Sequence, residues 1–170
     1  MARSRAERGA KMVRLAFFDM DGTLCAPRFY VGGKIVGGMS DTAWLAFCEK
    51  NGEDTYRFCK PVPMVTEYAE QLKNHGAKIY VLSTAQTAPE RAAKSKFVKQ
   101  NYPQGFFTEV LTVEHDADKL PVIRKVAEKE GVRLEDCELI EDTYATVLAA
   151  IVAGVRGTHV SQIYCNSAGE

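Results

Sequence analysis

Short apolar runs alternate along the chain with longer segments in which apolar residues recur at helical spacing. The uninterrupted runs are typical of strands covered on both faces, and they span residues 13–18, 78–82, 107–113, 137–140 and 157–160. Each segment between them has one apolar face, which predicts a helix, and these span residues 63–75, 89–100, 120–130 and 143–153. The alternation predicts right-handed crossovers and a three-layer, Rossmann-like α/β fold around a mainly parallel sheet.

Residues 26–59 interrupt this alternation directly after the first strand. Residues 29–36 predict a hairpin around a Gly-Gly pair, and residues 41–50 predict a helix. We therefore expect a small hairpin-plus-helix cap over the edge of the sheet. The expected parts are a flexible basic tail, a core in two pieces, the cap between them and a C-terminal tail, at residues 1–12, 13–25 with 60–165, 26–59 and 166–170.

Two acids, Asp19 and Asp21, follow the first strand, and Gly22 opens a turn after them. Parallel α/β sheets bind ligands beyond the carboxyl ends of their strands. Two carboxylates this close repel each other unless a cation or a proton lies between them, so the pair favours a divalent metal. The alternative is an ordinary Asp-Gly hairpin turn, but residues 23–27 lack the alternation of a returning strand.

The later parts of the chain add hydroxyls, an ammonium group and a second acidic pair. In chain order they are Ser83 and Thr84, Lys119, and Glu141 with Asp142. Because parallel strands end at one edge, these groups are expected to converge there. Phosphoryl transfer through an aspartyl-phosphate requires such a set. Two alternatives stay open. Lys119 would be an ordinary solvated lysine at the start of a helix, and Asp142 would cap the helix that follows it.

With these residues in this order, the chain resembles the haloacid-dehalogenase-like (HAD) hydrolase superfamily, in its β-phosphoglucomutase/phosphatase-like branch with a small cap. Residues 17–24, Phe-Phe-Asp-Met-Asp-Gly-Thr-Leu, match the first motif of that family closely. Residues 81–83, Lys119 and residues 139–142 match the second, third and fourth motifs. The resemblance covers residues 13–160 and implies the same fold.

The resemblance implies a catalytic pair of acids and a magnesium site. Asp19 would attack phosphorus and form the phospho-enzyme, and Asp21 would protonate the leaving group and then activate water. Mg²⁺ would be held by an Asp19 oxygen, the main-chain carbonyl of Asp21 and Asp142. Glu141 would join the metal ligands or accept a hydrogen bond from a metal-bound water.

The resemblance also implies how a phosphate ester would bind. Ser83 would donate to a phosphoryl oxygen, with Thr84 as the alternative hydroxyl, and Lys119 would offset the charge around the phosphate. In the cap, Arg28 and Lys34 would hold a second anionic group. Aromatic cap residues would either stack on a base or sugar or pack on the core, and they are Phe29, Tyr30, Trp44 and Tyr56.

The predicted function is Mg²⁺-dependent hydrolysis of a phosphomonoester through an aspartyl-phosphate, on a small phosphorylated metabolite such as a sugar phosphate or a nucleotide. Asp21 argues against dehalogenation, because the dehalogenases of this family lack an acid at that position. The alternatives are a phosphomutase or phosphotransferase, which so small a cap would shield poorly from water, and a non-catalytic binding or regulatory protein on the same fold.

The composition of the chain limits which binding partners and which cellular compartment are expected. The 170 residues carry 22 basic and 22 acidic side chains, so no overall charge favours nucleic acid or an anionic membrane. No apolar run reaches the length of a membrane span. Five cysteines without a Cys-x-x-Cys pair argue against disulfides and zinc, and they favour the cytoplasm. A homodimer stays open, since a partner subunit would complete a small cap.

Overall fold

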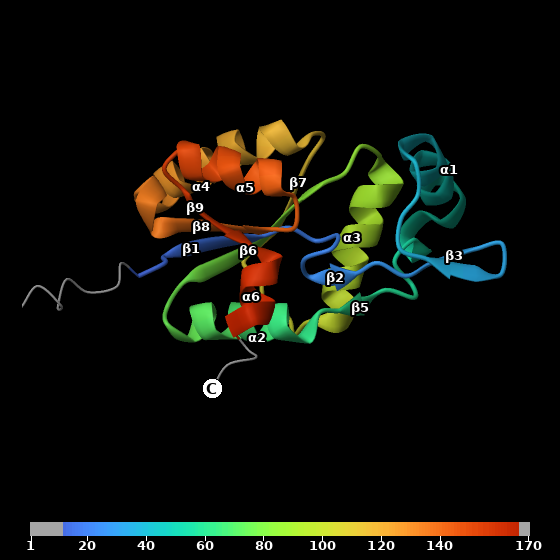
Figure 1. Ribbon diagram of the computed structural model, residues 1–170, viewed down its shortest axis with the longest axis horizontal. Helices are drawn as coiled ribbons and strands as arrows, with labels where there is room; N and C mark the ends of the chain where they lie inside the picture. The colour runs from blue at the N-terminus through green and yellow to red at the C-terminus, as the bar shows by residue number, and fades with distance from the viewer. Residues whose placement is uncertain (1–11, 167–170) are drawn as a thin grey trace, which may run out of the picture.

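The computed structural model describes residues 12–166, and its main sheet has five parallel strands. In spatial order these are β7 Val110–Val113, β6 Lys78–Thr84, β1 Leu15–Phe18, β8 Cys137–Glu141 and β9 Arg156–His159. Helices cover both faces of the sheet (Figure 1). One layer contains α2 Pro63–Asn74, α3 Ala88–Asn101 and α6 Val160–Asn166, and the other contains α4 Lys119–Glu130 and α5 Tyr144–Val152. The predicted three-layer α/β fold is confirmed.

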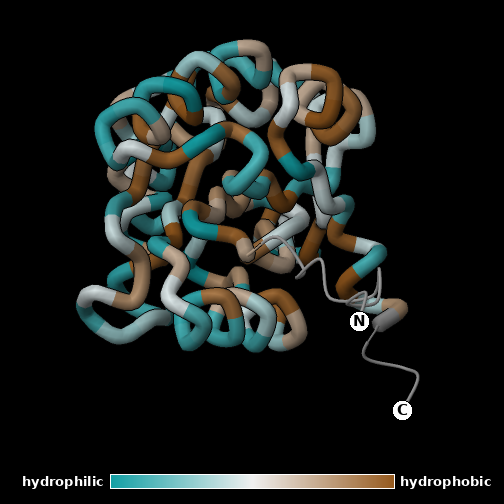
Figure 2. Tube along the Cα trace, turned by 90° about the vertical axis from the view of Figure 1, so that its left-hand side faces the viewer, coloured by the Kyte–Doolittle hydropathy of each residue, from teal (hydrophilic) through white to brown (hydrophobic). Residues whose placement is uncertain are grey.

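Two hydrophobic cores lie on the two faces of the sheet, because successive strand residues point in opposite directions. Ala16 and Phe18 pack with α2, α3 and α6, whereas Leu15 and Phe17 pack with α4 and α5. All four residues of β1 are buried, which explains its uniformly apolar sequence. Figure 2 shows hydrophobic stretches along the central strands, while much of the outer surface of the helices is hydrophilic.

The boundaries of all five strands differ by one to three residues from those that the sequence predicts, and the differences at β6 and β7 involve site or core residues. β6 runs two residues further, so Ser83 and Thr84 lie inside the strand and are held by its ladder to β7. β7 begins at Val110 rather than at Phe107, because the Phe107 ring turns into an aromatic group, with its centroid 5.0 Å from that of Tyr102. Ser83 and Thr84 therefore have less freedom than loop residues would have.

Helix α6 is missing from the predicted elements, the last of which is the strand at residues 157–160. Val160 and Ile163 are buried in the core on the face that α2 and α3 cover. The predicted tails at 1–12 and 166–170 lie outside the described residues, apart from Met12 and Asn166. Within residues 12–166, no helix is both long enough and apolar enough to cross a membrane.

The insert between β1 and α2 contains the predicted hairpin, β3 Phe29–Val31 with β4 Lys34–Val36, and the predicted helix, α1 Asp41–Asn51. A short antiparallel pair, β2 Cys25–Ala26 with β5 Lys60–Pro61, joins the two ends of the insert. The insert packs beside α3, through α1 and the 3₁₀-helix Gly52–Asp54 (Figure 1). The limits of the cap, at residues 26–59, stay a prediction.

Candidate active site

The loop after β1 brings the acidic residues of the two neighbouring strand ends together. The Asp19 amide donates to the Ile140 carbonyl at 2.9 Å, which extends the pairing of β1 with β8 beyond the strand. Gly22 then turns the chain with φ of +75°. A Cβ atom at Gly22 would lie 2.1 Å from Oδ2 of Asp142. Only glycine therefore allows the Asp142 carboxylate to approach this turn so closely.

Three of the predicted metal ligands form one carboxylate group. Oxygen atoms of Asp19, Glu141 and Asp142 all lie within 4.8 Å of one another, with Asp19 and Glu141 buried and Asp142 exposed. Three carboxylates this close suit a hard divalent cation such as Mg²⁺, which prefers oxygen ligands and retains waters. The Asp21 side chain, in contrast, has other partners, so only its main-chain carbonyl remains as the predicted ligand.

Lys119 joins this group from the start of α4. Its Nζ lies 2.8 Å from Asp19 Oδ1, 2.6 Å from Glu141 Oε2 and 3.0 Å from Asp116 Oδ1, and its side chain is 1% exposed. Burial alone would lower the pKa of Lys119, but the charges of Asp19 and Glu141 outweigh burial and hold it above its usual value. An ordinary surface lysine would show neither the burial nor these contacts.

Burial is also the main influence on Asp19. It raises the pKa of Asp19 from 3.8 to about 6, although the Lys119 charge opposes it, and the Glu141 charge adds to the increase. Burial likewise raises the pKa of Glu141. Without a cation in addition to Lys119, the site therefore resists holding its full negative charge.

The alternative that Asp142 caps α5 is wrong. The cap residue is Thr143, which makes no side-chain capping hydrogen bond. The amides of Asp142 and Thr143 donate instead to Glu141 Oε1, at 3.1 and 3.2 Å. The Asp142 carbonyl is also within 2.8 Å of His159 Nε2. The Asp142 carboxylate is accordingly free of a capping role at the helix.

Asp21 belongs to a second group of side chains, on the α3 side of the sheet edge. Its Oδ2 lies 2.8 Å from Nζ of Lys94, a residue of α3 whose side chain is 1% exposed. The hydroxyl of Tyr56, from the insert, donates to the same Oδ2 at 3.0 Å. Oδ1 of Asp21 is buried and has no hydrogen-bond partner among residues 12–166.

Ser83 is part of this second group as well. It is buried, and its Oγ accepts from Lys94 Nζ at 2.9 Å, while the carbonyl of Thr84 accepts from the same ammonium. Burial lowers the pKa of Lys94, but Asp21 and Asp19 outweigh it and hold the pKa above its usual value. Of the two candidate hydroxyls, Ser83 is the one in contact with the ammonium.

Sequence reasoning missed Lys94, although the chain carries a signal for it. Lys94 follows Ala93 on a helix face otherwise made of Phe97 and Val98, which are all buried. Glu90, one turn before it, is buried too, with an oxygen 3.5 Å from Lys94 Nζ. Two charged residues on the apolar face of a predicted helix indicate a buried ionic group, because charges are rarely buried without partners.

The cap residues contribute differently from what the sequence suggests. Phe29 and Tyr56 are buried and packed edge to face, with ring centroids 5.8 Å apart, and Trp44 packs on both. The idea that Phe29 and Tyr56 stack on a base is therefore wrong, because their faces are already covered. Arg28 and Lys34, the predicted anion ligands, lie exposed beside and on the hairpin.

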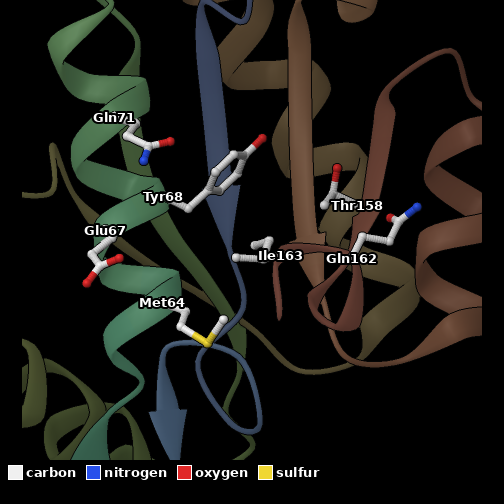
Figure 3. A pocket seen from close by; sticks show the side chains of 7 residues that line it. All are labelled: Met64, Glu67, Tyr68, Gln71, Thr158, Gln162 and Ile163. Atoms are coloured by element: carbon white, nitrogen blue, oxygen red, sulfur yellow. The ribbon is translucent and has the colours of Figure 1, made fainter. Parts of the chain in front are cut away.

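A groove between α2 and α6 lies apart from both groups (Figure 3). Tyr68 from α2 and Thr158 from β9 point toward it, and their hydroxyls donate to the buried Glu138 at 2.9 and 2.5 Å. The other residues lining it are Met64, Glu67, Gln71, Gln162 and Ile163. None of them is among the predicted site residues.

The sheet order, with helices on both faces and a group of acids at the carboxyl edge, defines a Rossmann-like α/β fold. No protein-family model and no curated protein sequence matches the chain. Solved structures do match it in fold. A protein assigned as a phosphoglycolate phosphatase from Lactobacillus delbrueckii subsp. bulgaricus matches with a TM-score of 0.61 and 14% identity, over 85% of this chain and 84% of that chain.

Two further structures agree with this assignment of the fold. A protein assigned as a HAD-like hydrolase from Bacteroides fragilis has a TM-score of 0.58 and 18% identity, over 85% of each chain. An analogue of the phospho-aspartyl intermediate of phosphoserine phosphatase has a TM-score of 0.57 and 14% identity, over 87% of this chain and 85% of that chain. At identities this low, the structural likeness shows a shared fold alone. The activity has to be argued from the site itself.

Proposed function

We propose that this protein is a Mg²⁺-dependent phosphomonoesterase that acts through an aspartyl-phosphate on Asp19. One observation carries the proposal: Lys119 contacts Asp19 and Glu141 within a group of three carboxylates at the carboxyl edge of a parallel sheet. A buried nucleophilic carboxylate, a fixed ammonium and a set of cation ligands are the parts that this chemistry needs. The phosphatases named among the similar structures support the same reading.

In the first step, an oxygen of Asp19 attacks phosphorus, and the bond from phosphorus to the ester oxygen breaks. Asp21 gives a proton to that departing oxygen, so the product leaves as an alcohol. In the second step, water attacks the phosphorus of the aspartyl-phosphate and gives a proton to Asp21. The Asp19 carboxylate and inorganic phosphate are then released. Lys119 and Ser83 would stabilise the charge on the phosphoryl oxygens.

The donor set fits Mg²⁺. Asp19, Glu141 and Asp142 would hold it together with the main-chain carbonyl of Asp21, and the Gly22 turn leaves space for the Asp142 carboxylate. Bound there, the metal would supply positive charge that lowers the repulsion between the carboxylates and a phosphate ester. Burial raises the pKa of Asp19 to about 6, so a cation bound here would help to keep its carboxylate charged.

We propose a small phosphorylated metabolite as the substrate, with a sugar phosphate and a nucleotide as the two main classes. Arg28 and Lys34 would bind a second anionic group, and both side chains are exposed to solvent. The expected cytoplasmic location, the expected lack of nucleic-acid and membrane partners, and the homodimer stay predictions. Thermal shifts with Arg28→Ala and Lys34→Ala, in the presence of singly and doubly charged phosphate esters, test the two basic residues.

The experiment is hydrolysis of a panel of phosphomonoesters by the full chain with Mg²⁺, with chelator, and by the Asp19→Asn variant. Asp54→Asn is the matched control, because Asp54 lies exposed in the insert and pairs with Lys96. We expect phosphate release that needs Mg²⁺, survives Asp54→Asn and is lost with Asp19→Asn. Absence of release from every ester by folded, Mg²⁺-saturated protein would contradict the proposal.

The phosphotransferase alternative makes a different prediction for the same reaction mixture. A transferase moves the phosphoryl group to an added alcohol or sugar, so that phosphate release falls as the acceptor concentration rises. The insert packs beside α3 instead of forming a large lid, which favours water as the acceptor. Adding acceptors to the panel and measuring both products separates the two activities.

A further inference from the structure

The buried ammonium of Lys94 is the feature of this edge that the proposed mechanism leaves unused. Its Nζ lies 2.8 Å from Asp21 Oδ2, donates to Ser83 Oγ at 2.9 Å and donates to the Thr84 carbonyl. Glu90 supplies a further carboxylate oxygen at 3.5 Å. A buried lysine is costly unless such partners compensate its charge. A side chain with only a structural role could be apolar and avoid this cost, so the buried charge of Lys94 indicates a role in the site.

Tyr56, from the insert, contacts the same carboxylate oxygen of Asp21. Its hydroxyl donates to Asp21 Oδ2 at 3.0 Å, and its ring is buried among aromatic residues of the insert and α3. One oxygen of Asp21 thus has two donors, from α3 and from the insert, while Oδ1 has none within the part of the chain that the structure describes. A carboxylate held through a single oxygen by two fixed donors has little freedom to rotate.

We propose that Lys94 and Tyr56 are positioning residues that hold Asp21 in the orientation from which it exchanges protons with the leaving group and with water. The inference rests on the proposed function and deepens it. Lys94 keeps its own proton throughout: the proton of the first step moves from Asp21 to the ester oxygen, and that of the second moves from water to Asp21. The Ser83 contact aligns the phosphate-binding hydroxyl with the same ammonium.

A direct phosphate contact by Lys94 would have a different signature. An ammonium that binds the phosphoryl group itself helps every ester equally, because all esters share that group. A residue that acts through Asp21 matters most where the leaving group needs a proton. Alkyl phosphates have poor leaving groups and need it, whereas p-nitrophenyl phosphate leaves as a stable anion and does not. The dependence on the leaving group therefore separates the two roles.

The test compares kcat/KM on a primary alkyl phosphate and on p-nitrophenyl phosphate, with saturating Mg²⁺ and the full chain. The variants are Lys94→Met and Tyr56→Phe. The matched controls are Lys96→Met, a partly exposed lysine on the same helix, and Tyr102→Phe, whose hydroxyl contacts Thr66. General acid–base catalysis is worth roughly 10²- to 10⁴-fold, so partial misplacement of Asp21 should cost about 10- to 100-fold.

We expect Lys94→Met to lower kcat/KM by about 10- to 100-fold on the alkyl ester and by less than about 3-fold on p-nitrophenyl phosphate. Tyr56→Phe should show the same selectivity with a smaller loss, and both controls should match the wild type. In the Asp21→Asn background, Lys94→Met should add less than about 3-fold. If Lys94→Met does not fold, Tyr56→Phe alone and in that background decides the matter.

Equal losses on the two esters would overturn the inference, and so would a full additional loss in the Asp21→Asn background. In both cases the wild type still hydrolyses the esters, so the proposed function stands without the positioning role. A wild type that releases no phosphate from either ester is a separate result, which overturns the proposed function and the inference together.

Discussion

Two buried lysines meet acids at the same edge of the sheet, and they differ in what surrounds them. Lys119 comes from the α4 side and contacts Asp19 and Glu141, two of the three carboxylates suited to a metal. Lys94 comes from the α3 side and contacts Asp21 and a hydroxyl, in a group that also includes Tyr56 from the insert. In the proposed mechanism, the first lysine neutralises charge on the nucleophile, and the second holds the residue that moves protons.

The largest expected effect separates the two lysines directly. Lys119→Met should lower kcat/KM by roughly 10²- to 10³-fold, since it removes a fixed charge from the developing transition state. Because that charge acts on the phosphoryl group, the loss should be similar for alkyl and aryl esters, in contrast to Lys94→Met. Steady-state kinetics on both esters measures it.

Asp116→Asn provides the comparison for that measurement. Asp116 also contacts Lys119, but its side chain is 50% exposed, so solvent screens the pair. We expect its kcat/KM to stay within about 3-fold of the wild type. A selective loss on alkyl esters with Lys119→Met would mean that the two lysines do not have the separate roles that their contacts indicate.

The next prediction concerns pH and the metal-free protein. Asp19 has a pKa of about 6 when folded and 3.8 as its usual value, so the native state binds the extra proton between these pH values. The wild type should therefore lose stability as the pH rises from about 4 to about 6, by roughly 3 kcal/mol for a two-unit shift. Asp19→Asn cannot titrate and should be the more stable protein above pH 6, with the difference closing toward pH 4.

Urea unfolding in chelator at several pH values measures this difference in the free energy of unfolding. Asp54→Asn is again the control, since Asp54 is exposed and its pKa is lowered by Lys96 rather than raised. A gap between Asp19→Asn and the wild type that stays constant with pH would show that Asp19 does not titrate in this range. Saturating Mg²⁺ should reverse the order of the two proteins.

A smaller effect is expected at Gly22, where the backbone sets the position of a metal ligand. A Cβ atom there would overlap Asp142 Oδ2, and the φ of +75° disfavours any other residue. Gly22→Ala should weaken Mg²⁺ binding by about 10- to 100-fold, as displaced ligands commonly do. Calorimetric titration with Mg²⁺ measures it. Gly76→Ala, also at positive φ but with open space around it, is the matched control for backbone strain alone.

The Lys119 side of the site follows from the sequence, and the Lys94 side does not. The acids of the first side lie directly after β1 and within or after β8, where parallel strands end, so the strand pattern alone predicts that Asp19, Glu141 and Asp142 meet. Lys94 reaches Asp21 only because α3 packs on the sheet face that carries Ala16 and Phe18, and Tyr56 reaches it only because the insert packs against α3. Such contacts depend on tertiary packing, which the period of apolar residues does not record.

The weakest expected effect tests how far the Lys94 group extends into the insert. Trp44 Nε1 donates to Glu90 Oε1 at 3.1 Å, and Glu90 in turn lies near Lys94. Trp44→Phe removes the donor but keeps most of the ring, so the free energy of unfolding should fall by about 1 kcal/mol. Its kcat/KM on alkyl esters should fall by less than about 3-fold, because Lys94 keeps Asp21 and Ser83 as partners. A loss as large as that of Lys94→Met would instead make Trp44 a further part of the proton-transfer machinery, since the indole would then control Asp21 through Glu90 and Lys94.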